Sequence, residues 1–249
     1  MKAEEFISGL LPDTKDERDI LLGNYLIPYK LPSVISWKDI NIPVKDQGNK
    51  PYCSGFAGAG MKEIQERLDH NTIYSFSGDW LYHECKKIDG SPNEQGTYIR
   101  AAMKVLQNKG MYHRLNNKDF YFPIEAYARV NNLEELKVAV VSTGPLCIGV
   151  PVYKNWFKDY VINAPGPEEN ELGGHAILVT GYDDNKQLVE FKNSWGSSWG
   201  EQGYGYLTYR YINNLMESAW SAVDLHDKLT GYFVNQKKIR SRLYQVYHS

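Results

Sequence analysis

The stretch GGHAILVTGYDDNKQLVEFKNSWGSSWG, residues 173–200, carries the clearest structural signal in the chain. Two runs rich in β-branched and aromatic residues flank the polar residues 183–187, a pattern typical of a β-hairpin. In such a hairpin His175 lies opposite Asn193 or Ser194, and a bulge would shift this pairing by one position. An asparagine there can accept a hydrogen bond from the imidazole and fix its orientation. The hairpin therefore predicts a paired histidine and asparagine.

A second segment, NKPYCSGFAGAG, places Cys53 where a loop turns into a helix. Apolar residues recur at helical spacing over residues 54–70. A helix N-terminus and a neighbouring imidazolium both favour the thiolate over the thiol, so Cys53 is a candidate nucleophile and His175 its base. The alternative for an isolated cysteine is a small buried apolar residue, and that interpretation applies to Cys85 and Cys147.

These motifs resemble those of the papain-like cysteine peptidases, in which Gln, Cys, His and Asn follow one another in this order. The order is met by Gln47 in VKDQG, by Cys53, by His175 in GGHAILVTGY and by Asn193 in KNSWGSSWGEQGYGYL, the most specific of the four motifs. The resemblance covers residues 31–225. It implies an α+β fold of two lobes, one helical and one an antiparallel sheet or barrel, with the active site in the cleft between them.

The resemblance also implies a role for each residue. Cys53 would attack a peptide carbonyl, and His175 would act first as base and then as the acid that protonates the leaving amine. Asn193 would orient the imidazole, and Gln47 would hold the oxyanion together with the backbone N–H of Cys53. Taken alone, Asn193 could equally hold a turn, and Gln47 is typical of a surface loop.

The same resemblance implies a set of substrate-binding residues. Trp195 would shield the His–Asn pair from water on the leaving-group side, and Gly96 would pair its backbone with an extended substrate. The other members line the main specificity pocket, although Tyr98 is also compatible with a helix-face aromatic. The full set is Gly96, Tyr98, Gly149, Ala176 and Trp195.

Three departures separate the chain from the usual family pattern. Lys50-Pro51-Tyr52 precede the cysteine where Cys-Gly-Ser is usual, and Ser54 follows it in place of an aromatic residue. The partner cysteines for the family's disulfides are missing, although Cys85 falls where one half of a bridge would be. We therefore expect a domain that folds without bridges and is related to the divergent microbial members.

Composition narrows the remaining possibilities. The chain has 249 residues, 42% hydrophobic and 23% charged, with a net charge of -2, which gives no general reason to expect nucleic acid or an anionic membrane. No apolar stretch is long enough to span a bilayer, and the N-terminus is too acidic for a secretory signal. Three widely spaced cysteines favour a reducing compartment, so we expect a cytoplasmic protein, although a removed signal peptide would leave the same sequence. The oligomeric state stays open.

Helical periodicity precedes strand patterns along the chain, which by itself favours an α+β fold. Helices are expected at residues 54–70, 98–108 and 133–142. Strands are expected after Pro145, at residues 146–153, 175–182, 187–195 and 203–211.

Two end segments flank the expected peptidase domain of residues 33–225. Residues 1–32 are charged and interrupted by prolines, and the resemblance suggests a pro-like extension that crosses the cleft; a simply packed or frayed N-terminus fits equally. Residues 226–249 carry a net charge of +4, from five basic residues and one acidic residue. A solvated edge explains this tail better than contact with nucleic acid or lipid.

The sequence thus predicts a cysteine peptidase that acts on peptides or proteins without a cofactor. A metal enzyme is disfavoured because the chain has no paired Cys/His ligand spacing. Two alternatives stay open: a catalytically silent relative that binds peptides in the same cleft, and an acyl transferase in which an amine replaces water.

Overall fold

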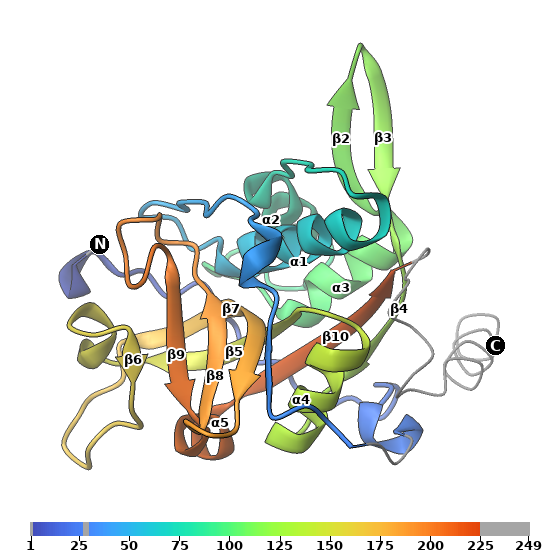
Figure 1. Ribbon diagram of the computed structural model, residues 1–249. Helices are drawn as coiled ribbons and strands as arrows, with labels where there is room; N and C mark the ends of the chain where they lie inside the picture. The colour runs from blue at the N-terminus through green and yellow to red at the C-terminus, as the bar shows by residue number, and fades with distance from the viewer. Residues whose placement is uncertain (1, 27–29, 225–249) are drawn as a thin grey trace.

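In the computed structural model, which describes residues 2–26 and 30–224, a helical lobe packs against a β-sheet (Figure 1). The α-helices are α1 (Cys53–His70), α2 (Gly78–Lys86), α3 (Ile99–Asn108), α4 (Leu133–Ser142) and α5 (Tyr209–Leu215). The strands are β1 (Val34–Ser36), β2 (Met111–Leu115), β3 (Lys118–Phe122), β4 (Ile124–Arg129), β5 (Leu146–Val152), β6 (Val161–Ile162), β7 (Gly173–Asp183), β8 (Leu188–Lys192), β9 (Tyr204–Thr208) and β10 (Ser218–Asp224). Short 3-10 helices are η1 (Ala3–Glu5), η2 (Leu22–Tyr25), η3 (Lys38–Ile40) and η4 (Lys154–Phe157). The basic segment predicted at residues 226–249 lies outside the described residues.

The large sheet has eight strands in the order β4–β10–β5–β7–β8–β9–β6, with β1 paired to β7. Its pairings among the described residues are antiparallel except for that of β6 with β9. Because side chains alternate along a strand, the two faces enter different cores: Ile148 of β5 packs with α4 and α5, and Cys147 packs under α1 and α3. Helices α1–α3 in one lobe and an antiparallel sheet in the other confirm the α+β prediction.

Helix α1 runs from the cleft into the centre of the molecule, and glycines let α2 approach it closely. A Cβ atom added at Gly55 would lie 2.3 Å from the Gly78 carbonyl oxygen, and one added at Gly58 would lie 2.8 Å from the Leu81 side chain. Each glycine costs helix stability, about 1 kcal/mol relative to alanine. The close packing of the two helices offsets that cost and fixes Cys53 at the start of α1.

The predicted helices at residues 54–70, 98–108 and 133–142 are confirmed to within one residue at each end. The strand predicted at residues 203–211 is wrong beyond Thr208, because the Thr208 side chain accepts a hydrogen bond from the Tyr211 N–H and caps α5. The β7–β8 register also differs from the prediction, by one residue at Leu178–Lys192 and by two at Asp183–Leu188. A bulge between Val179 and Gly181 adds the extra residue.

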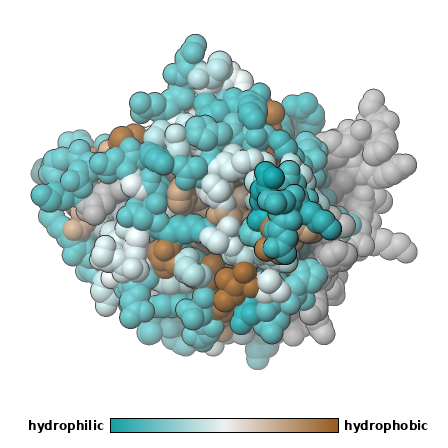
Figure 2. All heavy atoms as spheres, turned by 90° about the horizontal axis from the view of Figure 1, so that it is seen from above, coloured by the Kyte–Doolittle hydropathy of each residue, from teal (hydrophilic) through white to brown (hydrophobic). Residues whose placement is uncertain are grey.

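Strands β2 and β3 form a separate hairpin that projects from the helical lobe (Figure 1). Asn116 and Asn117 make its turn with φ of 50° and 60°, as a tight hairpin with this twist requires. From above, the molecule is mostly hydrophilic, with apolar residues in small separate patches (Figure 2). No helix among the described residues is both long and apolar enough to cross a membrane.

Candidate active site

Cys53 is the first residue of α1, and its side chain is fully buried. The backbone N–H of Ala176 on β7 donates a hydrogen bond to the Cys53 sulfur. Ala176 directly follows His175, so this contact brings the sulfur from the helical lobe to the strand that carries the predicted base. The structure therefore brings the predicted nucleophile and base to the same junction between the lobes.

His175 is fully buried, and one of its ring nitrogens is paired with the predicted asparagine. The distance from His175 Nε2 to Asn193 Oδ1 is 2.8 Å, and the same oxygen accepts a hydrogen bond from the Ser194 N–H at 2.8 Å. Because an amide oxygen can only accept, this pairing places a proton on Nε2 and leaves Nδ1 as the basic nitrogen of the neutral ring.

Aromatic rings enclose the imidazole. Trp195 stacks on His175 with ring centroids 4.7 Å apart and an interplanar angle of 29°. Trp156 and Phe6 meet the same imidazole edge-on, at 6.1 and 6.0 Å. Phe157 stacks on Trp195 in turn, at 5.4 Å and 12°. These rings exclude water and restrict the rotation of the imidazole.

Gln47 is also buried, and its amide is held at both ends. Gln47 Oε1 accepts a hydrogen bond from the Ser194 hydroxyl, and Gln47 Nε2 donates one to the Lys50 carbonyl at 2.7 Å. The backbones of Gln47 and Ser194 are bonded as well, at 2.8 Å. The Gln47 side-chain N–H group therefore points into the loop that leads to Cys53.

Three buried side-chain nitrogen atoms at this site have no hydrogen-bond partner among the described residues. They are His175 Nδ1, Asn193 Nδ2 and Trp195 Nε1. Buried polar groups are normally paired, and unpaired ones in native proteins need a reason such as a catalytic role. Here all three belong to His175 and to the Asn193 motif that is hydrogen-bonded to it.

Burial keeps both reactive groups neutral. It raises the pKa of the Cys53 thiol to about 11, and the hydrogen bond from the Ala176 N–H offsets only part of this rise. Burial also lowers the pKa of His175 to about 4, although the hydrogen bond with Asn193 acts in the opposite direction. The ionised pair expected from the sequence is thus disfavoured in this state, because water is excluded from both groups.

The N-terminal segment of residues 6–11 provides part of this cover. Its backbone pairs with both sides of the cleft: Gly9 N and Leu10 N donate to the Gly174 carbonyl at 3.3 and 3.4 Å, and Leu11 N donates to the Thr97 carbonyl at 3.1 Å. Thr97 N returns a bond to the Gly9 carbonyl at 3.1 Å. A Cβ atom added at Gly9 would lie 2.9 Å from Cys53 Sγ, so this glycine backbone lies directly against the sulfur.

Two apolar side chains anchor residues 6–11 on either side of Gly9. Leu10 is only 4% exposed, and its side chain lies so close to Gly149 that a Cβ atom there would be 2.6 Å from Leu10 Cδ2. Phe6 packs edge-on against Trp195, with ring centroids 5.7 Å apart. The segment therefore runs from the tryptophan side of the cleft to the Gly149 pocket.

The predicted substrate-binding residues fall into two groups. Four contact the segment or the site: Gly149 and Trp195 meet Leu10 and Phe6, Gly96 (φ +84°) lies against the Gly9 carbonyl, and Ala176 bonds to Cys53. The fifth, Tyr98, lines a separate hollow of about 180 Å³ with residues that include Asp13 and Arg100, and its hydroxyl lies 3.3 Å from Ser91 Oγ.

A lysine organises the loop that carries Gly96. Lys86 Nζ donates to the carbonyls of Ser91, Glu94 and Gly96, at 2.6, 3.0 and 3.0 Å, and pairs with Asp89 at 2.8 Å. Burial would raise the pKa of Asp89, but hydrogen bonds from Lys86, the Ser91 N–H and the Thr97 hydroxyl hold it below its ordinary value. The three cysteines are all free, so this loop is held by the Lys86 contacts and not by a disulfide bridge.

Charged contacts also tether the N-terminal segment beyond Leu11. Asp13 accepts a hydrogen bond from Trp220 Nε1 at 2.6 Å, and Arg100 reaches Asp19 through Nε and a second nitrogen, at 3.0 and 2.6 Å. In the part of the chain that the structure describes, no cluster of three or more His, Cys, Asp or Glu side chains could hold a metal ion.

Sequence reasoning did not identify Phe6, Gly9, Leu10, Trp156 or Lys86 as parts of the site. Their roles depend on contacts with residues far away in the chain. The local signal was the short apolar stretch of residues 6–11, Phe-Ile-Ser-Gly-Leu-Leu, between charged residues on either side.

Comparison with known proteins adds an independent line of evidence. The family model described as papain family cysteine protease matches residues 31–223. An uncharacterized peptidase C1-like protein of Acanthamoeba polyphaga mimivirus is 28% identical over 76% of this chain and 72% of its own length. Procathepsin L of Felis catus is 26% identical over 82% of this chain and 69% of its own length. Among solved structures, xylellain, a cysteine protease from Xylella fastidiosa, superposes with a TM-score of 0.73 at 27% identity, over 88% of this chain and 96% of its own.

Proposed function

The chain belongs to the papain family of cysteine proteases and is a cysteine peptidase, and from this premise we propose that Cys53, His175, Asn193 and Gln47 form its catalytic set. One observation carries the assignment. The hydrogen bond of 2.8 Å between His175 Nε2 and Asn193 leaves His175 Nδ1 as the unpaired, basic nitrogen. The residue that follows His175 in the chain, Ala176, donates its backbone N–H to the Cys53 sulfur.

The proposed reaction has two stages. His175 Nδ1 takes the thiol proton, and the Cys53 sulfur attacks the substrate carbonyl carbon. The carbonyl oxygen becomes an oxyanion, which accepts hydrogen bonds from Gln47 Nε2 and from the Cys53 N–H. The tetrahedral intermediate then collapses, the C–N bond breaks, and His175 transfers its proton to the leaving amine. In the second stage His175 takes a proton from water, and the hydroxide attacks the thioester carbonyl. The C–S bond breaks, the carboxylic acid leaves, and His175 returns the proton to the Cys53 sulfur.

Substitution of the nucleophile tests this assignment. In the protein lacking residues 2–12, whose cleft is uncovered, Cys53→Ala should abolish cleavage of a mixed peptide library, while Cys147→Ala, at another fully buried cysteine, should retain it. Both variants are checked for folding by thermal unfolding. Cleavage by Cys53→Ala at the rate of the parent protein would refute the catalytic set. Product analysis with added amines distinguishes hydrolysis from transfer of the acyl group to an amine.

We also propose that residues 6–11 hold the enzyme inactive by occupying the cleft in reverse. A substrate runs from the acyl side, at Gly149, to the leaving-group side, at Trp195. The segment runs the other way, from Phe6 at Trp195 to Leu10 at Gly149, and Leu10 pairs with Thr97 in the parallel direction. The Gly9 carbonyl accepts a hydrogen bond from the Thr97 N–H, and the reversed direction supports a block in which the segment is not cleaved.

Removal of residues 2–12 tests this second proposal, because the tether that begins at Asp13 stays in place. The shortened protein should cleave peptides faster than the full chain. Leu10→Gln should have a similar but smaller effect, since it makes the Gly149 pocket a poor site for the segment. Equal activity of all three proteins would contradict the block. Inactivity of all three, with Cys53 reactive in each, would point to the silent peptide-binding relative.

A further inference from the structure

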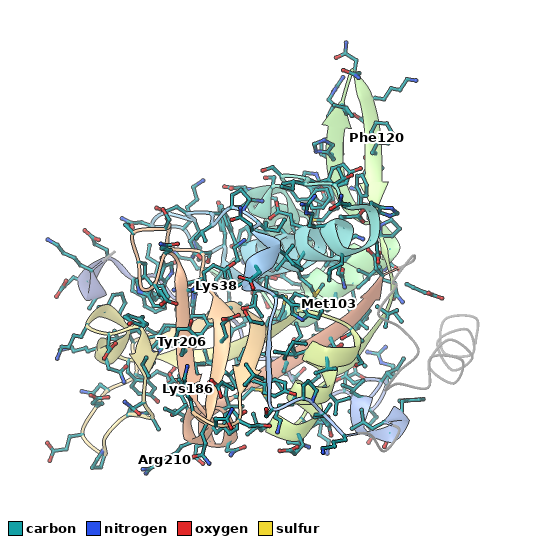
Figure 3. All side chains as sticks on the ribbon, viewed as in Figure 1. Lys38, Met103, Phe120, Lys186, Tyr206 and Arg210 are labelled. Carbon is teal, nitrogen blue, oxygen red and sulfur yellow. The ribbon has the colours of Figure 1, made fainter. Side chains whose placement is uncertain are left out.

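A hollow of about 380 Å³ opens on the sheet away from the catalytic residues. Its walls come from β1, β6, the β7–β8 hairpin and β9, and its lining includes none of the catalytic residues. Tyr206 and Lys186 mark this side of the sheet, with Lys38 above them, in the view of Figure 3. Pockets for small ligands typically enclose about 300–1,000 Å³, so the hollow is large enough for one.

A buried carboxylate, Glu190 of β8, lines this hollow and has no cation of its own. Its side chain is only 8% exposed, and Oε1 accepts hydrogen bonds from the hydroxyls of Ser36 and Thr180, both at 2.8 Å. Glu190 forms no ion pair with any residue of 2–26 and 30–224, and its Oε2 accepts no hydrogen bond from them. Burial of a carboxylate that lacks a paired cation is costly, and it raises the pKa of Glu190, although the hydrogen bonds from Ser36 and Thr180 and the charge of Lys38 act in the opposite direction.

The other charged groups around the hollow are already matched. Glu201 pairs with Lys38 at 2.6 Å and accepts a hydrogen bond from the Tyr206 hydroxyl at 2.7 Å. Lys186 pairs with Asp183 at 3.4 Å. Glu190 is therefore the one acidic group in the lining that a positively charged ligand would complete.

Tyrosine rings and aliphatic side chains make up much of the remaining wall. The rings of Tyr160 and Tyr206 lie 6.3 Å apart at an angle of 60°, and Tyr160 is 41% exposed. Val34, Val161 and Leu188 add apolar surface. Ring faces next to a carboxylate suit an alkyl chain that ends in an ammonium or guanidinium group, because the rings attract the cation and cover the chain.

We propose that this hollow is a binding site for a small organic cation, a primary ammonium or guanidinium group on a short apolar chain. The cationic head pairs with Glu190 Oε2, and the chain lies against Tyr160 and Tyr206. The site is separate from the peptidase cleft, and its occupancy does not depend on the catalytic set.

Titration calorimetry on the full chain tests the site directly. Cadaverine and agmatine supply the two cationic heads, Nα-acetyl-lysine amide supplies the same head on a peptide side chain, and 1,5-pentanediol is the neutral control. We expect saturable 1:1 binding of the free amines, and at least about tenfold weaker binding of the diol, because it lacks a charge-assisted hydrogen bond. Tighter binding of the lysine amide than of cadaverine would assign the site to a peptide side chain.

Three variants separate the named contacts. Glu190→Gln, which keeps the size of the side chain, should weaken cadaverine binding at least about tenfold. Tyr160→Ala should weaken it severalfold, and it removes an exposed side chain that folding does not need. The matched control, Glu201→Gln, should change it less than threefold, since that carboxylate already has a lysine. Thermal unfolding checks each variant. Unchanged binding in both Glu190→Gln and Tyr160→Ala, or no saturable binding to the wild type at tens of millimolar amine, would overturn the proposal. None of these readouts uses peptidase activity.

Discussion

The two walls of the cleft differ in how their polar groups are paired. On one wall, aromatic rings enclose His175, and three polar atoms of His175, Asn193 and Trp195 have no hydrogen-bond partner. On the other wall, Lys86 donates hydrogen bonds to three carbonyls and holds the loop that carries Gly96. The first wall is dry and its polar groups are incompletely paired, which in the proposed mechanism leaves a nitrogen free for proton transfer. The second wall is polar and well paired, which fixes a backbone in place. The proposed chemistry thus depends on unpaired groups in a dry site, and the proposed substrate recognition depends on a well hydrogen-bonded loop. A substitution can therefore disturb one without the other.

The largest expected effect concerns the protonation of the dry wall. The unfolded chain protonates this histidine near pH 6.5, whereas the folded chain holds its pKa at about 4. The unfolded state therefore binds more protons between these values, and the stability of the folded state falls as the pH decreases from 6.5 to 4. His175 should account for about 3 kcal/mol of that loss.

Urea unfolding of the wild type and of His175→Gln over this pH range provides the measurement. The relevant quantity is the difference between the two proteins, because Glu63 and Glu190, whose pKa values burial raises, act in the opposite direction in both. Parallel pH profiles would show that the imidazole is not held neutral by the closed site.

The second prediction concerns the reactivity of the Cys53 sulfur once residues 2–12 are removed. With a pKa of about 11, about one Cys53 thiol in 10,000 is ionised at pH 7, against about one in 100 at the ordinary value of 9.0. Removal of residues 2–12 should therefore raise the rate of iodoacetamide labelling at pH 7 by at least about 100-fold. Cys85 and Cys147 are internal controls, because their burial in the core does not depend on that segment and also raises their pKa. Equal labelling of Cys53 in both proteins would show that other groups cover it.

The third prediction concerns the hydrogen bond that orients the imidazole. In the protein lacking residues 2–12, Asn193→Ala should lower kcat about 10- to 100-fold, a part of the 100- to 10,000-fold that an acid–base group contributes. KM should change little, because Asn193 acts through His175. The matched control is Asn163→Ala at an exposed position. A change in KM alone would move Asn193 from orientation of the ring to substrate binding.

Sequence could predict the dry wall far better than the polar one. The helical spacing of apolar residues in α1 and the hairpin pattern of β7 and β8 are local features of the sequence. They are sufficient to predict that Cys53 lies at a helix start and that His175 and Asn193 lie on facing strands. The predicted contact between Asn193 and His175 is present although the bulge shifts the strand register. The Asn193 side chain reaches the imidazole from beyond the last regular pair, Leu178–Lys192.

The features that sequence missed depend on long-range packing. The block by Gly9 needs the Gly174 and Thr97 backbones, which lie far away in the chain, and no local period marks it. Helix α2 is short, with nine residues, and its packing on α1 depends on the close approach of Gly78 to Gly55 as well as on Leu81. The neutral state of Cys53 could not be read from its helix position, since burial outweighs the helix terminus there.

The smallest expected effect concerns the polar wall, where Lys86 holds the loop that carries Gly96. Lys86→Met keeps the length of the aliphatic stem but leaves the carbonyls of Ser91, Glu94 and Gly96 without their shared donor. The Gly96 backbone, which the resemblance predicts to pair with substrate, should then lose its fixed position. In the protein lacking residues 2–12, KM should rise about tenfold, the effect of losing one charged hydrogen bond, with kcat nearly unchanged.

Two neighbouring substitutions make this last test specific. Lys87→Met removes an exposed lysine whose partner is Glu84, and it should leave both constants within twofold of the parent. Lys86→Arg keeps the charge and should restore part of the affinity, because a guanidinium can reach Asp89 but fits three converging carbonyls less well. A fall in kcat with constant KM in Lys86→Met would mean that the loop acts on the imidazole wall after all, and the separation of the two walls would fail.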